Sequence, residues 1–386
     1  MNVNVKVKET SDSGKREVEK AARAMVVEIE AGAGGDQIQA ALDGAREGAT
    51  VHLPAGEYRL RNALKLPAGK KLKLAGDGLL NATRLVAGQD FQGEALVEAL
   101  SPSRMELADL WIDAGRGEGA RTALAVAKVD QTGSLVHGDQ LHSEGWDVGM
   151  EVQNLDGARV VLENHGHNGM RLSGGSLLQR GEASTGRVEI LCGASSRGGS
   201  RPGVPIYDVR AGGRMWVRDI WYEGDPEEYL HLKDRGEFVQ CGNRIATNKA
   251  RGHGTEDAIV IEGKAGLALL AQCSPHGANL RVGRVPEGFT CLLYGLTPYP
   301  ETKVELAAPG KNCARLFCRQ NNLPGTGSEP LEDLGDVSDE MILRVMEPLR
   351  RLVPVSPEEP PDGSTALRMH RVFLNGRVGV RIHGGG

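Results

Sequence analysis

The sequence has few aromatic residues and no long apolar run. Four tryptophans, six tyrosines and five phenylalanines make up 4% of the 386 residues, although 40% of the chain is hydrophobic. A core built from this chain must therefore be mainly aliphatic. No stretch approaches the roughly 18 consecutive apolar residues of a membrane-spanning helix, and residues 1–25 are too polar for a signal peptide. We expect no contact with a membrane and no export signal in this chain.

Charge and cysteine content exclude further classes. The net charge of -5, with both signs interspersed, leaves no basic field, so we expect no nucleic-acid partner. Six cysteines in a chain of this length are too few for a disulfide scaffold. The closest pair, Cys313 and Cys318, has the spacing of neither a zinc site nor a redox motif. Most of the cysteines are expected to be small buried hydrophobes.

Glycine, in contrast, is abundant. The chain has 53 glycines, which is about twice the ordinary share of roughly 7%, whereas its 18 prolines are an ordinary number. This combination excludes collagen and disordered low-complexity sequence. An aliphatic core with glycine at frequent turns predicts a β protein with many turns.

Short units repeat through the middle of the chain. Residues 141–153 (LHSEGWDVGMEVQ) and 162–173 (LENHGHNGMRLS) each open with a leucine, continue through a polar turn and close on Gly-Met-x-aliphatic. A single unit of this kind cannot bury its apolar face, so the units must stack, and their short strands must form parallel sheets. The alignment predicts that Met150 and Met170 point inward in successive coils.

The N-terminal part of the chain predicts a helix followed by two strands. Asp36 can cap a short helix whose residues Ile38 and Leu42 share one face. Residues 49–53 then read as a strand, and a Pro-Ala-Gly turn leads to a second strand over 57–60.

This arrangement, together with LKLPAGKKLKLAGDG (64–78), resembles the N-terminal cap and first coils of the pectate lyase-like superfamily. The resemblance implies an all-β fold, a right-handed parallel β-helix, with an N-terminal helical cap and a small C-terminal appendage. We divide the chain into an N-terminal arm (1–30), the β-helix domain (31–323) and a C-terminal region (324–386).

The C-terminal region predicts a helix, a linker and a hairpin. Residues 338–353 place apolar side chains at helical spacing, with acids in the first turn and arginines in the last. A proline-rich linker (356–364) follows, and 366–382 read as a hairpin around an Asn-Gly turn. The apolar positions of the helix are Ile342, Val345, Met346, Leu349 and Leu352.

The superfamily resemblance implies an enzyme that acts on an acidic or complex polysaccharide, as a lyase or a glycoside hydrolase, outside the cell, in the periplasm or at the cell surface. The alternative is a non-catalytic solenoid for glycan binding, adhesion or assembly. RGHG (251–254) resembles the Gly-His-Gly element of polygalacturonases, but the aspartates of that family are missing. Their absence disfavours hydrolysis by the polygalacturonase mechanism.

A uronate lyase needs a base that removes the proton next to the carboxylate, and a cation that neutralises the developing enolate. His165, His167 or His253 can supply the base, because histidine exchanges protons near neutral pH. Arg218 or Arg251 can supply the cation. Glu223, in the turn of a neighbouring unit, is a candidate acid.

Aromatic residues near the polar turns are candidates for a saccharide subsite, because sugar rings stack on exposed aromatic faces. They are Trp146, Trp221 and Tyr222, and Arg218 lies close to two of them in the sequence. No cofactor is expected. Calcium is possible, although no DxDxD run is present, and its candidate ligands would be Glu144, Asp147, Glu223 and Asp257.

Overall fold

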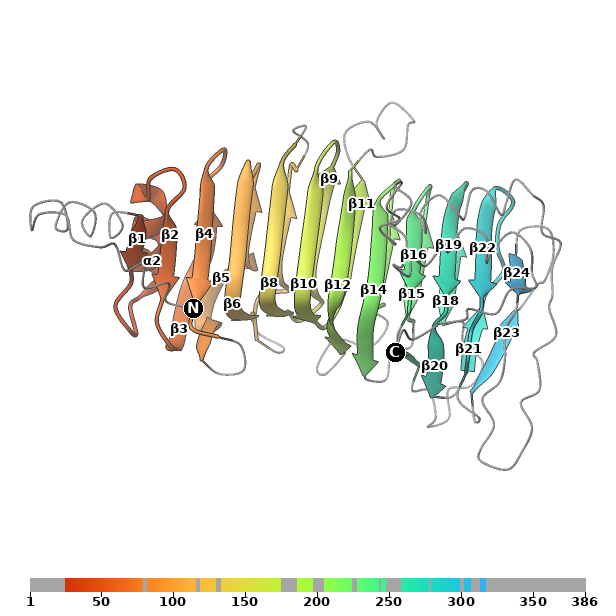
Figure 1. Cartoon of the computed structure of the whole chain (residues 1–386). Helices are drawn as coiled ribbons and strands as arrows, with labels where there is room; N and C mark the ends of the chain where they lie inside the picture. The colour runs from red at the N-terminus through yellow and green to blue at the C-terminus, as the bar shows by residue number, and fades with distance from the viewer. Residues whose placement is uncertain are drawn as a thin grey trace, which may run out of the picture.

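The computed structural model describes residues 25–78, 82–115, 119–129, 133–174, 186–196, 205–223, 228–242, 244–247, 258–277, 279–298, 302–306 and 313–316. In these residues the chain winds as a parallel β-solenoid (Figure 1). Twenty-two strands are hydrogen-bonded into one wound sheet, and two more strands pair separately. The solenoid predicted from the repeats is confirmed.

The wound sheet has three faces, which we call the first, second and third sheets. In each of them a strand pairs with its equivalents in the coils before and after. The first sheet stacks β1 (Val26–Glu28), β2 (Thr50–Leu53), β4 (Lys71–Gly76), β6 (Arg104–Asp113), β8 (Leu135–Glu144), β10 (Arg159–His167), β12 (Arg187–Ser196), β14 (Arg214–Glu223), β16 (Glu237–Cys241), β19 (Gly266–Ala271), β22 (Phe289–Tyr294) and β24 (Cys313–Leu316).

The third sheet stacks the alternate strands of the chain. It contains β3 (Gly56–Leu66), β5 (Thr83–Leu100), β7 (Thr122–Ala127), β9 (Val148–Leu155), β11 (Met170–Gly174), β13 (Tyr207–Arg210), β15 (Leu230–Lys233), β18 (Ile259–Glu262), β21 (Asn279–Val282) and β23 (Lys303–Leu306).

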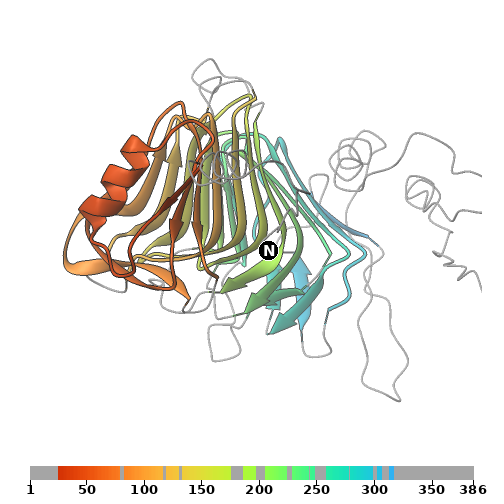
Figure 2. The ribbon, with the colours of Figure 1, turned by 60° about the vertical axis from the view of Figure 1, so that its left-hand side comes forward.

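The second sheet lies between the other two. It is formed by the first halves of β3 and β5 and by the last residues of β6, β8, β10, β12 and β14. The separate parallel pair consists of β17 (Arg244–Thr247) and β20 (Ser274–Gly277). Figure 2, which is turned from Figure 1, shows the strands of successive coils lying side by side along the solenoid.

A column of left-handed residues bends each long strand from the first sheet into the second. Asp109, Gln140, Asn164, Cys192 and Asp219 have φ between 49° and 58°, and the strand register superposes them in successive coils. Residues with a side chain adopt this conformation at a cost of about 1–2 kcal/mol, least for Asn and Asp. The bend therefore recurs at one place in each of these five coils, and it fixes which of their residues reach the second sheet.

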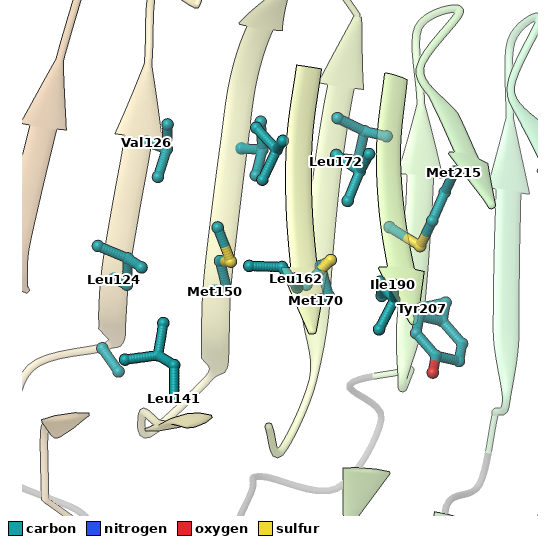
Figure 3. Packing of buried hydrophobic residues seen from close by; sticks show 14 of the residues in the cluster. Leu124, Val126, Leu141, Met150, Leu162, Met170, Leu172, Ile190, Tyr207 and Met215 are labelled. Carbon is teal, nitrogen blue, oxygen red and sulfur yellow. The ribbon is translucent and has the colours of Figure 1, made fainter. Parts of the chain in front are cut away.

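The interior is filled by aliphatic side chains in register. Met170 pairs with Met150, and Leu172 pairs with Val152. Both methionines are buried, and Figure 3 shows them side by side in the core. Their predicted alignment is confirmed. The alignment of the opening leucines is wrong, because Leu162 pairs with Gly138 instead.

Truncation of Met170 to alanine should destabilise the protein by about 2 to 5 kcal/mol, because it leaves a cavity in a closed core. The measurement is equilibrium unfolding in denaturant. Gln153→Ala serves as the control, because Gln153 is exposed on neighbouring β9, and a surface change of this kind shifts stability by about 0.5 kcal/mol or less. Equal losses in the two variants would contradict the register.

One helix, α2 (Gly35–Gly44), lies at the N-terminal end of the solenoid and buries Ile38 and Leu42. Its cap differs from the prediction. Gly34 is the N-cap residue, and its N–H donates to Oε1 of Gln37 at 2.9 Å, whereas Asp36 lies inside the first turn. No described helix is long and apolar enough to span a membrane.

Two other predictions have partial outcomes. Cys273 and Cys291 are buried as expected, but Cys192 is exposed at the bend and Cys241 is half-buried. The predicted C-terminal helix, linker and hairpin lie outside the described residues.

Candidate functional site

His165 and His167 lie inside the solenoid and not on an exposed turn as predicted. Both have 0% exposure, and their rings stack with centroids 5.3 Å apart. Nε2 of His165 lies 3.2 Å from Oγ of Ser143, and the ring of His167 packs edge-on against Tyr207. Neither side chain can reach a saccharide outside the wall, so neither can act as the base.

Strand geometry explains this correction. After the bend at Asn164, the segment His165-Gly166-His167 continues β10 into the second sheet. Side chains alternate between the two faces of a strand, so the two histidines point inward and Gly166 lies on the outer face. Tyr222 is also on an inward position and is fully buried, which removes it from the predicted saccharide subsite.

The other predicted site residues are at least partly exposed to solvent or lie outside the described residues. Trp221 is 41% exposed on the outer face of the second sheet. Arg218 stands before the bend, on the first sheet, with Nε 3.5 Å from Oδ2 of Asp219. Trp146 is half-buried in the turn between β8 and β9. Arg251, His253 and the side chain of Glu223 lie outside the described residues.

The outer face of the second sheet combines chemical groups that the sequence does not bring together. The strand register places Trp111, His142, Gly166, Ala194 and Trp221 in one outward column across five coils. We call this column the shelf. Gly166 and Ala194 give it a flat floor, bounded by His142 on one side and by Trp221 on the other. Three strand spacings separate those two residues, which is about 14 Å.

The imidazole of His142 leans over this floor. A Cβ atom added to Gly166 would collide with Nδ1 of His142, so only glycine at this position lets the ring lie where it does. On its other side the ring meets Trp111 edge-on, with centroids 5.2 Å apart. Nε2 lies 3.8 Å from Oε2 of Glu144. The ring is thus packed between Trp111 and Gly166, while 29% of the His142 side chain remains exposed.

A cation lies at the same end of the shelf. The guanidinium carbon of Arg84 stands 4.8 Å from the ring centroid of Trp111, on a strand next to it. The guanidinium forms an ion pair with Asp113 and lies 3.4 Å from a carboxylate oxygen of Glu57. Arg84 has a 31% exposed side chain, so a ligand carboxylate can approach it from solvent.

Of the four candidate calcium ligands, only Glu144 and Asp147 have side chains within the described residues. No group of three or more His, Cys, Asp or Glu side chains within them is placed to hold a metal ion. Glu144 lies beside His142, and Asp147 lies 3.1 Å from Nε of Arg121, so each has a neighbour other than a metal.

Comparison with known proteins gives distant structural likeness and no family. No protein-family model and no curated protein matches the sequence. Among solved structures, ORF18 of Geobacillus virus E2 is 11% identical with a TM-score of 0.49, and the match covers 81% of this chain and 64% of that chain. The match therefore spans less than two thirds of the viral protein.

Two further structures have similar scores. Alginate lyase from Paenibacillus sp. str. FPU-7 is 15% identical with a TM-score of 0.47, and the match covers 73% of this chain and 99% of the lyase. Tailspike protein 2 of Escherichia coli O157:H7 bacteriophage CAB120 is 11% identical with a TM-score of 0.40, and the match covers 72% of this chain and 39% of the tailspike.

Proposed function

We propose that this protein binds an acidic polysaccharide across the shelf and cleaves it by β-elimination. The observation that carries the proposal is the position of His142, whose ring lies over the glycine floor between an accessible cation and an exposed tryptophan. The resemblance of residues 34–78 to the pectate lyase-like superfamily points to the same class of substrate.

Each group has a separate role in the proposed reaction. Trp221 stacks on a sugar ring, and the small side chain of Ala194, between Trp221 and the His142 ring, lets the chain of sugars approach the sheet closely. Arg84 pairs with the uronate carboxylate and stabilises the negative charge that builds on it when the neighbouring C–H bond breaks. His142 takes that proton.

The electron pair of the broken C–H bond becomes a carbon–carbon double bond, and the glycosidic C–O bond of the neighbouring carbon breaks. The leaving oxygen takes up a proton and becomes the hydroxyl of the released sugar. No oxidant or reductant is needed, so the reaction is balanced with these residues and water.

The proposal is tested by incubating the purified protein with a panel of uronate and neutral polysaccharides. Ultraviolet absorbance detects the unsaturated sugar, and a reducing-end assay detects any cleavage. We expect both signals on a uronate polymer. Reducing ends without unsaturated product would indicate hydrolysis, and binding without either would favour a non-catalytic glycan-binding solenoid.

Replacing Trp221 with alanine should weaken binding of the selected polysaccharide by about 3- to 10-fold, the effect of losing one aromatic stacking contact. Isothermal titration measures the change. Leu100→Ala is a matched control, because Leu100 is also 41% exposed but lies on the third sheet. A binding loss of the same size in the control would count against the shelf.

A further inference from the structure

One outward column of the first sheet changes from polar to apolar along the solenoid. In the N-terminal coils it carries Lys73, Glu106 and His137, which are partly exposed. In the C-terminal coils the strand register places four apolar residues in the same column. We call these four residues the apolar stripe: Trp216, Val239, Leu269 and Leu292.

The apolar stripe is buried although it lies on the outside of the wall. Its residues are between 0% and 3% exposed, and none of them belongs to the interior cluster, which takes the alternate residues of the same strands. Neighbours on a sheet cover only the sides of an outward side chain. Trp221, outward on the second sheet, stays 41% exposed, and Val161, outward in the same column as the stripe but nearer the N-terminus, stays 9% exposed. Something must lie over the stripe.

Among the described residues, the Arg187 guanidinium lies over Trp216 at 4.6 Å, but no described element lies over Val239, Leu269 and Leu292. The only described helix, α2, lies at the opposite end of the solenoid, and every other described element is a strand of the wall or of the β17–β20 pair. The last described strand, β24, continues the same column, since Ala314 pairs with Leu292. The chain therefore enters residues 317–386 from the end of the first sheet where the stripe lies.

We propose that residues 338–353 dock on the apolar stripe as an amphipathic helix. Their apolar positions lie at helical spacing. A helix of this length, with a kink expected at Pro348, is about 24 Å long, and the stripe spans three strand spacings, or about 14 Å. The residues between β24 and the helix can span up to about 70 Å, so the connection is long enough.

Charged side chains beside the stripe match the charges that residues 338–353 carry at their two ends. Arg187 lies over the ring of Trp216 at 4.6 Å, and Nε1 of Trp216 donates to Glu237 at 3.1 Å. The stripe is thus apolar along its centre and carries both charge signs at one edge. Residues 338–353 likewise carry acids in the first turn and arginines in the last.

The test keeps the full chain and introduces a specific protease site within residues 324–337. After cleavage, size-exclusion chromatography shows whether the C-terminal fragment stays with the solenoid. We expect it to stay in the otherwise unchanged protein and to be released in a Leu349→Asp variant, which changes the proposed helix and leaves the solenoid sequence intact. Leu269→Asp should release it as well, and circular dichroism verifies that the solenoid has folded.

His137→Asp is the matched control, because it places the same charge in the same column at its polar end. The fragment should remain bound in this variant. Release of the fragment from the otherwise unchanged protein, or retention in Leu349→Asp, would overturn the proposal. If Leu269→Asp instead dissociates a dimer while the fragment is retained, the stripe is covered by a second copy of the chain and the proposal fails.

Discussion

As the pH falls below 6.5, the protein is expected to lose stability steeply, because two buried histidines cannot take up protons in the folded state. Burial, and then the neighbouring His167 and His142, hold the pKa of His165 well below its ordinary value. Burial, followed by the charge of His142, lowers the pKa of His167 from 6.5 to about 3. In the unfolded chain both rings bind protons near pH 6.5.

The sign follows from proton counts. Between pH 6.5 and about 3 the unfolded state binds more protons than the folded state, so the free energy of unfolding decreases as the pH decreases. His167 contributes about 1.4 kcal/mol per pH unit over this range, or about 2.7 kcal/mol by about pH 4.5, and His165 changes the stability in the same direction. The loss from His167 alone is a large part of the roughly 5–15 kcal/mol by which folded proteins are stable.

The prediction is tested by denaturant unfolding at a series of pH values. A His165→Gln/His167→Gln double variant, whose side chains do not titrate, should show a much shallower loss than the unchanged protein. His52→Gln is the control with the opposite sign. Burial lowers the pKa of His52, but hydrogen bonds and charge from Glu28 and Asp77 outweigh it and raise that pKa.

The stability that His52 contributes is thus present at low pH and is lost as the pH rises through its folded-state pKa. Its replacement should leave the acid loss at least as steep. An equally steep acid loss in the double variant would show that the buried histidines are not its cause.

Replacing His142 with alanine should reduce turnover of the uronate polymer by about 100- to 10,000-fold, the usual contribution of a positioned base. Stability should change little, because His142 lies on the outer face of the second sheet. The measurement is the initial rate of unsaturated product. A rate within a few-fold of the unchanged protein would remove His142 from the mechanism.

The Gly166→Ala variant keeps His142 but displaces its ring, so it tests whether turnover depends on where the ring lies. The added methyl group would collide with Nδ1 of His142 and push the ring off the floor of the shelf. We expect a fall in kcat with a small effect on KM, since the base is still present but misplaced. Gly44→Ala is the control, because an added Cβ there meets nothing within 4 Å.

The sequence predicts the fold well because stacked coils place similar residues at equivalent positions, which appear in the sequence as repeats. The Gly-Met pairs at the start of β9 and β11 place Met150 and Met170 in equivalent positions, and the structure confirms them. The same periodicity fails for the histidines because coil length varies. Leu141 and His165 are equivalent in the second sheet, whereas Leu162 belongs to the first.

The candidate site is harder to predict because it depends on a bend. Asn164, at a left-handed φ of 50°, turns β10 into the second sheet, and a segment that reads as a polar turn becomes a strand with alternating faces. His142 stands in a similar polar segment, and only the register across coils brings it over Gly166. The glycine between two histidines was the available signal, since a strand glycine often marks a close approach.

The most direct test of the glycan site is a crystal structure of the His142→Ala variant with an oligosaccharide of the polymer that the screen selects. We predict density for sugar rings over Ala194, with one ring stacked on Trp221 and a carboxylate facing Arg84. An oligosaccharide bound only to the outer face of the first or third sheet, with the shelf empty, would contradict the proposed site.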